Sequence, residues 1–295
     1  MANAKKRVHE NVPGDFFVDT TCIDCDACRQ IAPAVFGETG QTSYVHTQPA
    51  TPADRRQALR ALLACPTGSI GCAGADDPRA AMADFPLLID GPVHYCGYNS
   101  PKSYGGNSYF VSDPAGNWLI DAPKFVTPLV RRIEELGGVA HIFLTHRDDV
   151  ADAERYAKHF TSRRVIHRDE LASQPGAEHV LDGAGPWELA PGFLAIHTPG
   201  HTRGHCVLLV RDRYLFTGDH LDWDRDGARL SASRDYCWHS WPRQIESMNR
   251  LLDYNFEWVL PGHGQRVQLP AEEMHRQLAA LTAQMQGAAN GSDQA

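Results

Sequence analysis

The stretch Pro199-Gly200-His201-Thr202-Arg203-Gly204-His205 decides how the larger part of this chain is expected to fold. Three other short motifs accompany it, namely Thr145-His146-Arg147-Asp148-Asp149, Thr217-Gly218-Asp219-His220 and Pro261-Gly262-His263-Gly264. Each motif comes at the end of a predicted strand, where loops can converge on one edge of a sheet sandwich. Because histidine and aspartate are common metal ligands, the motifs together predict a metal site.

Taken in this order, the motifs resemble those of the metallo-β-lactamase superfamily, which includes glyoxalase II and the flavodiiron proteins. The resemblance extends from Phe85 to about Gln268 and includes Asp121, which follows a hairpin signal. It implies an αββα sandwich. Under this resemblance the first metal ion is held by His146 and His201, Asp219 bridges two ions, and His263 serves the second ion.

The family pattern H-x-H-x-D-H is altered in this chain, which has His146-Arg147-Asp148-Asp149-Val150-Ala151-Asp152-Ala153. Asp148 replaces the second histidine, as a carboxylate does in flavodiiron proteins, and the Asp-His pair is absent at its usual spacing. Oxygen ligands favour iron or manganese over zinc. The number of ions stays open, because the sequence fits a dinuclear site and equally a mononuclear site of His146, Asp148, His201 and Asp219.

Several residues near these motifs have two interpretations. Asp148 is favoured as a ligand because it lies two residues from His146, although Asp148 or Asp149 also fits the N-cap of the next helix. Asp152 is a second-ion ligand if the loop extends by two residues, and Asp148 and Asp152 are the candidate catalytic bases. We expect His205 to be structural, while His220 either supports a metal ligand or only packs.

The N-terminal segment carries a second set of ligands. Cys22, Cys25 and Cys28 form a C-x2-C-x2-C run, and 36 residues separate Cys28 from Cys65-Pro66. Three closely spaced thiolates and a distant Cys-Pro are typical of a 4Fe-4S cluster. A zinc knuckle is the alternative, but zinc sites prefer paired C-x2-C units. We expect Cys72, just past the motif, to be a bystander.

This segment resembles single-cluster bacterial-type ferredoxins over roughly the first 75 residues. The fold class expected for the whole chain is therefore α+β, with a small ferredoxin-like domain followed by an αββα metallo-β-lactamase sandwich. A helix is predicted over residues 52–64, with Thr51 as its N-cap. The predicted domain organisation is a ferredoxin-like domain at 1–75, a linker at 76–84, a metallo-β-lactamase-like domain at 85–286 and a flexible tail at 287–295.

Composition restricts the compartment and the partners. The formal net charge of −8 argues against a nucleic-acid-binding surface. No apolar run reaches the length of a membrane helix, and residues 1–19 lack the apolar core of a signal peptide. We therefore expect a cytoplasmic protein with no membrane or nucleic-acid partner, in which clustered cysteines bind metal. The expected partners are a small-molecule substrate and, for the cluster, a redox protein.

Two enzymatic functions fit these features. The first is a metal-dependent hydrolase acting on an ester, thioester, lactone or phosphoester, with one or two divalent ions of iron, zinc or manganese. The second is an iron-dependent oxidoreductase in which the 4Fe-4S cluster supplies electrons to a non-haem iron site. A redox-sensing binding protein that keeps the hydrolase fold as a scaffold is the non-enzymatic alternative.

Overall fold

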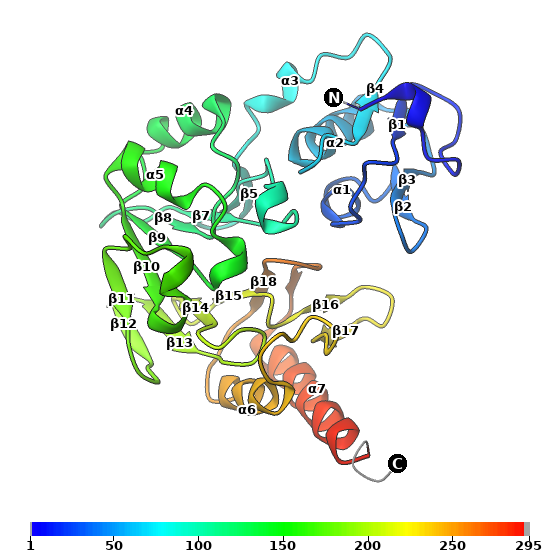
Figure 1. Ribbon diagram of the computed structural model, residues 1–295. Helices are drawn as coiled ribbons and strands as arrows, with labels where there is room; N and C mark the ends of the chain where they lie inside the picture. Colours follow the sequence, from blue (N-terminus) through cyan, green and yellow to red (C-terminus); the bar gives the residue numbers. More distant parts are fainter. Residues whose placement is uncertain (1, 292–295) are drawn as a thin grey trace. The chain divides into compact units, whose positions relative to one another are not determined.

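The computed structural model describes residues 2–291 and shows an α+β chain with several sheets (Figure 1). The chain divides into two compact units, one of Met1–Ile142 with Ala151–Ser162 and one of Phe143–Val150 with Arg163–Ala295. The cysteine-rich segment and the strands that follow it thus fall into one unit, which differs from the predicted domain boundaries. No helix among the described residues is both long and apolar enough to cross a bilayer.

The cysteine-rich segment consists of two small antiparallel sheets and two helices. Strand β1 pairs with β4, and β2 pairs with β3. A short 3-10 turn, η1 (Ala4–Lys6), precedes the other elements, which are β1 (Phe16–Val18), α1 (Ala27–Ile31), β2 (Phe36–Glu38), β3 (Ser43–Val45), α2 (Pro52–Ala64) and β4 (Ile70–Cys72).

Helix α2 confirms the helix predicted over residues 52–64. The Thr51 hydroxyl accepts a hydrogen bond from the Asp54 amide at 3.1 Å, and the Asp54 carboxylate accepts one from the Thr51 amide at 3.3 Å. This reciprocal capping box satisfies two amides that the helix leaves without an internal partner. The helix ends at Ala64 and places Cys65 at its C-cap, next to the loop of the other cysteines.

The remainder of the first unit is an antiparallel meander with three helices. The strands are β5 (Leu87–Asp90), β6 (Val93–Tyr95), β7 (Tyr109–Val111) and β8 (Trp118–Ile120), with β9 (His141–Phe143) next to β8. The pairing of β7 with β8 confirms the predicted hairpin. The helical elements are α3 (Arg79–Met82), which lies within the predicted linker, η2 (Pro101–Ser103), α4 (Thr127–Glu135) and α5 (Ala153–Phe160).

The second unit is organised around a six-stranded sheet in the order β12-β13-β14-β15-β18-β19. Its strands are β12 (Trp187–Ala190), β13 (Phe193–His197), β14 (Cys206–Val210), β15 (Tyr214–Gly218), β18 (Trp258–Pro261) and β19 (Val267–Gln268). The unit also contains a parallel pair, β10 (Arg163–His167) with β11 (His179–Leu181), and a hairpin, β16 (Asp222–Asp224) with β17 (Arg229–Ser231). Two 3-10 turns, η3 (Arg147–Asp149) and η4 (Arg168–Ser173), complete it with two helices, α6 (Trp241–Leu251) and α7 (Ala271–Gly291).

Strand direction brings the predicted metal motifs to one edge of this sheet. Strands β15 and β18 are parallel, so their carboxyl ends meet, and the amide of Gly262 donates to the Gly218 carbonyl at 2.8 Å. Strand β14 runs antiparallel to β15 and therefore begins at the same edge. The loop of residues 198–205, which leads into β14, consequently lies beside the ends of β15 and β18.

Helices α6 and α7 pack together, and their apolar side chains share one core with the sheet. Buried members of this core include Ile196, Val207, Leu209, Leu215, Met248, Leu251, Val259, Met274 and Leu278. Burial on this scale stabilises the sheet that carries the metal motifs. Helix α7 extends into the tail predicted from residue 287, while residues 292–295 lie outside the described part of the chain.

Candidate metal centre

Four loops of the second unit converge at the sheet edge and bring the predicted ligands together. The turn η3 supplies Asp148 and Asp149, and the amide of Cys206 donates to the carbonyl of Thr145 at 2.9 Å, which fixes the start of that turn to strand β14. The other ligands follow strands β13, β15 and β18. The ends of four separate elements therefore enclose one small volume.

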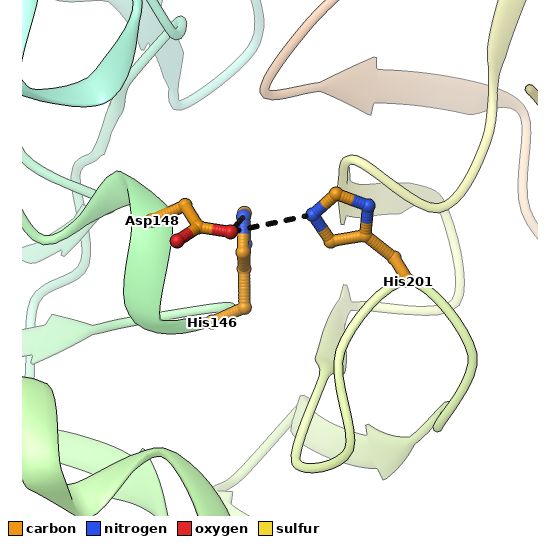
Figure 2. Close-up of side chains that lie close together, drawn as sticks. All are labelled: His146, Asp148 and His201. Carbon is orange, nitrogen blue, oxygen red and sulfur yellow. Dashed lines mark ion pairs between the residues drawn. The ribbon is translucent and has the colours of Figure 1, made fainter. Parts of the chain in front are cut away.

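His146, Asp148 and His201 form the first group of donor atoms (Figure 2). The Asp148 carboxylate lies 3.9 Å from Nε2 of His146 and 3.8 Å from Nε2 of His201. A carboxylate oxygen of Asp219 lies 3.6 Å from each of the same two nitrogens. These separations exceed those of hydrogen bonds and leave room for an ion between the donors.

The two histidines of this group differ in what surrounds their rings. Burial lowers the pKa of His146 to about 4, against the opposing charge of Asp219. The Nδ1 atom of His201 lies 2.5 Å from the carbonyl oxygen of Tyr236, which only accepts hydrogen bonds, so Nδ1 carries the proton. The Nε2 atoms of both rings are buried without a hydrogen-bond partner among the described residues. Buried lone pairs of this kind fit a metal ion.

Asp149, His263 and Asp219 form a second group. Nε2 of His263 lies 3.8 Å from the Asp149 carboxylate and 3.9 Å from the Asp219 carboxylate. The donor atoms of His146, Asp149 and Asp219 lie within 4.8 Å of one another. Asp219 thus contacts both groups, in the position of the bridging ligand that the resemblance implied.

The absence of a side chain at Gly262 leaves room for the carboxylates of Asp149 and Asp219 in this group. A Cβ atom at Gly262 would lie 2.5 Å from an oxygen of Asp149 and 2.7 Å from an oxygen of Asp219. Both distances are shorter than a non-bonded contact allows, so a side chain here would displace the carboxylates. The glycine that precedes His263 therefore makes space for the second group.

Two expectations from the sequence need correction. Neither Asp148 nor Asp149 caps a helix, because α5 begins after Asp152 and the carboxylates of Asp148 and Asp149 face the histidines. Asp152 is not the carboxylate beside His263, since that place belongs to Asp149. The oxygens of Asp152 instead accept hydrogen bonds from Nζ of Lys102 at 2.7 Å and from the amide of Phe125 at 2.9 Å. Its role as a base stays a prediction.

Glu170 is a buried carboxylate beside the site that no motif indicated. Its side chain is 1% exposed, and its carboxylate accepts the amide of Gly204 at 2.6 Å and the amide of Arg147 at 3.2 Å. One carboxylate thereby ties the loop of His201 to the turn of Asp148. The only sequence signal is an acidic residue after a strand, which is too common to single out.

His205 and His220 lie behind the ligands. Nδ1 of His205 lies 2.9 Å from the Thr198 hydroxyl, which agrees with the structural role predicted for it. The two rings stack with centroids 5.2 Å apart, and burial lowers the pKa of His220 to about 3. His220 is thus a buried ring that packs against His205.

The four predicted cluster ligands also meet in space. Cys22, Cys25, Cys28 and Cys65 line one cavity of the first unit. Backbone amides donate to two of the sulfurs, from Asp24 and Ser43 to Cys22 at 3.4 Å and from Ser69 to Cys65 at 3.3 Å. Burial raises the pKa of the Cys25 thiol to about 12. Buried sulfurs that receive amide hydrogen bonds fit an iron–sulfur cluster.

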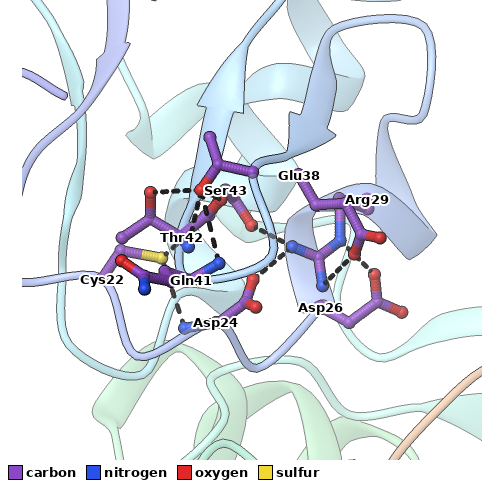
Figure 3. A network of polar contacts seen from close by, with 9 residues as sticks. Cys22, Asp24, Asp26, Arg29, Glu38, Gln41, Thr42 and Ser43 are labelled. Carbon is purple, nitrogen blue, oxygen red and sulfur yellow. Dashed lines mark hydrogen bonds and ion pairs between the residues drawn. The ribbon is translucent and has the colours of Figure 1, made fainter. Parts of the chain in front are cut away.

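A buried arginine shapes the cysteine loop (Figure 3). Arg29 donates to the carboxylates of Asp24 at 2.5 Å and Asp26 at 2.6 Å and to the Ser43 hydroxyl at 2.8 Å. Asp24 and Asp26 have φ values of 56° and 64°, in the left-handed region that non-glycine residues rarely adopt. The arginine network therefore stabilises the turns that direct the cysteines inward.

Comparison with known families identifies the cysteine-rich segment. Residues 18–72 match the family model of the 4Fe-4S single cluster domain of ferredoxin I. The match spans all four cysteines that line the cavity. The chain carries a 4Fe-4S ferredoxin domain.

More than half of the chain is similar to lactamase-like proteins. One relative, from Pestalotiopsis microspora, is 28% identical over 187 residues, which cover 60% of this chain and 54% of that protein. The lactamase-like protein aptB of Emericella nidulans is 28% identical over 171 residues, which cover 54% of this chain and 51% of that protein. The chain thus spans about half the length of the curated relatives it matches.

Solved structures confirm the expected fold. The metallo-β-lactamase DIM-1 exposed to ceftazidime matches with a TM-score of 0.52 and 17% identity, over 67% of this chain and 95% of that one. The TMB-1 structure matches with a TM-score of 0.51 and 17% identity, over 66% and 95%. At this identity the likeness establishes the fold and leaves the reaction open.

Proposed function

We propose that this protein is a metal-dependent hydrolase with a two-ion centre. The first ion is held by His146, Asp148 and His201, the second by Asp149 and His263, and Asp219 is shared. The observation that carries the proposal is the position of Asp219, 3.6 Å from the histidines of one group and 3.9 Å from the histidine of the other. Two ions so placed would supply Lewis-acid polarisation of the scissile bond and lower the pKa of a water.

The exposure of the three carboxylates indicates which of them acts as the general base. The side chain of Asp148 is 48% exposed, whereas that of Asp149 is 2% and that of Asp219 is 14% exposed. Asp148 is therefore the carboxylate that a substrate reaches from solvent, and it accepts a proton from water on that side. His201 pulls the pKa of the Asp148 carboxyl below its usual value, so it is ionised at neutral pH.

The rim of the site favours substrates with an apolar or planar group. Tyr236 and Trp238 are 64% and 57% exposed, and their rings meet edge to face with centroids 6.1 Å apart. The amide of Trp238 donates to the His201 carbonyl at 2.9 Å, so the aromatic pair is fixed beside a ligand. Ring faces of this kind bind flat or aliphatic groups. We therefore propose an ester, thioester, lactone or phosphoester with such a group.

The experiment is an anaerobic purification followed by metal and sulfide analysis and an assay of ester, thioester, lactone and phosphoester substrates. We expect two ions per chain beyond the iron matched by sulfide, and hydrolysis that is lost in His263→Ala. The matched control is His179→Ala, a half-buried histidine of the same unit in strand β11. Wild-type metal content and turnover in His263→Ala would contradict the two-ion centre.

The second candidate is an oxidoreductase, and one observation favours it. Three of the six donors are carboxylates, which suit iron, and the same chain carries a cluster. Cys25→Ala separates the two candidates, because a hydrolase keeps its activity without the cluster and an oxidoreductase loses it. We also propose that the protein is cytoplasmic and that its cluster exchanges electrons with a redox partner protein. Absence of any turnover would favour the scaffold alternative.

A further inference from the structure

A loop from the meander of the same unit contacts Cys25, one of the cysteines that line the cluster cavity. Gly105 has a φ of +90°, and a Cβ atom there would lie 2.6 Å from Cβ and 3.0 Å from Sγ of Cys25. The amide of Asn99 donates to the carbonyl of Ala64 at 3.2 Å, just before Cys65. The loop thus contacts both the cysteine run and the segment of the fourth ligand, and only glycine fits its closest approach.

The loop is rigid. Asn99 is fully buried, donates to the Gly105 carbonyl at 2.7 Å and accepts a hydrogen bond from the Tyr95 hydroxyl at 2.7 Å. The backbone amide of Gly105 donates to the Ser100 carbonyl at 2.8 Å. Residues outside the ferredoxin domain consequently form a fixed part of the cluster's surroundings.

Lys124 contributes a positive charge next to this loop. Its Nζ donates to the carbonyl of Pro66 at 2.6 Å, and its backbone amide donates to the Tyr98 carbonyl at 2.9 Å. Burial lowers the pKa of the Lys124 ammonium, while the negative charges of Cys65, Asp152 and Cys25 oppose that shift. The ammonium therefore lies within electrostatic reach of two cluster ligands.

The other charged groups near the cavity form one ion-pair network. Arg29 interacts with Cys28 and is paired with Asp24, Asp26 and Glu38, so this network holds more negative than positive charge. Asp26, a member of the network, also acts on Cys25. The hydrogen bond of Lys124 goes to a neutral carbonyl, and its ammonium acts on Cys65, Asp152 and Cys25.

We propose that the positive charge of Lys124 raises the reduction potential of the cluster. One-electron reduction makes the cluster more negative, and a cation beside Cys25 and Cys65 stabilises that state. The metallo-β-lactamase-like part of the chain thus sets the electron affinity of the ferredoxin domain. This role is independent of whether the metal centre hydrolyses or reduces its substrate.

The test is a redox titration of the full-length protein with its cluster, followed by visible absorbance and by the EPR signal of the reduced cluster. The neutral variants are Lys124→Met and Lys124→Gln, Lys124→Arg retains the charge, and Lys158→Met is the control at an exposed lysine of helix α5. We expect the reduced-to-oxidised ratio at a fixed potential to fall about tenfold in both neutral variants, which equals 59 mV for one electron. Lys124→Arg and Lys158→Met keep the wild-type potential.

Iron and sulfide are counted on each variant before the titration. Wild-type potentials in both neutral variants with an intact cluster would overturn the proposal. Loss of the cluster in both neutral variants, with retention in Lys124→Arg, would also overturn it, because the charge would then hold the cluster rather than set its potential. An equal shift in Lys158→Met would show a general charge effect and would overturn it too.

Discussion

In the ferredoxin domain three of the four predicted cluster ligands come from one run of seven residues, whereas the proposed metal centre takes its ligands from the ends of four separate elements. The cysteine loop is shaped locally, by the ion pairs of Arg29. The metal centre depends on the register of strands β14, β15 and β18 and on Glu170, which joins two of the loops. Loss of a cluster ligand should therefore leave the metal centre unchanged, whereas the effect of losing a metal ligand should depend on whether both ions share it.

The largest effect is expected for Asp219→Asn. Asp219 contacts histidines of both groups, so its replacement removes a shared ligand and both ions are lost. We expect hydrolysis to fall by about a thousandfold or more, which is about 4 kcal/mol in transition-state stabilisation. The measurement is metal content together with turnover. Asp224→Asn, in strand β16, is the control, and retention of either ion at full occupancy in Asp219→Asn would break the shared-ligand account.

Cys65→Ser tests whether the two regions are independent. The variant is expected to lose its cluster, because the cluster needs four thiolates and Cys65 is the fourth, the one outside the cysteine run. Iron and sulfide of the cluster are expected to disappear, while the ions of the metal centre stay at the wild-type level. Elemental analysis of the same sample gives both results. A parallel loss of ions from the metal centre would show that the regions depend on each other.

Glu170→Gln tests the link between the loops of the metal centre. The amide keeps the shape of the side chain but replaces an accepting oxygen by a donor that faces a backbone amide. We expect metal affinity to fall about 10- to 100-fold, as for other residues that orient ligands. Competition with a chelator measures this affinity. Glu178→Gln, at a half-exposed carboxylate paired with Arg164, should leave it unchanged, and equal effects in the two variants would contradict the link.

The smallest effect is expected for Trp238→Ala. Loss of an exposed ring removes about 1 kcal/mol of substrate contact, so KM should rise several-fold for substrates with an aromatic group and kcat should stay the same. Tyr254→Ala, at a partly buried aromatic residue of the same unit, is the control. An unchanged KM would remove the aromatic rim from the proposed substrate site.

The same contrast explains what the sequence predicted. The cluster ligands stand in one short run with a remote Cys-Pro, so the pattern alone indicated them, and the capping signal at Thr51 fixed helix α2. The motifs at strand ends correctly predicted that His146, His201, Asp219 and His263 come together. The sequence left the helix cap open between Asp148 and Asp149, because the path of the backbone through the turn, which no local pattern records, brings both carboxylates to the histidines. Glu170 and Lys124 depend on contacts between distant segments, which no local pattern records.

The central claim is that one chain holds a cluster and a separate two-ion centre that shares Asp219. Its most direct test is the count of iron, zinc, manganese and acid-labile sulfide per chain after anaerobic purification, in the wild type and in His263→Ala. We predict iron matched by sulfide plus two further ions in the wild type, and the same cluster with one further ion in the variant. A wild-type protein with at most one ion beyond its cluster would contradict the account.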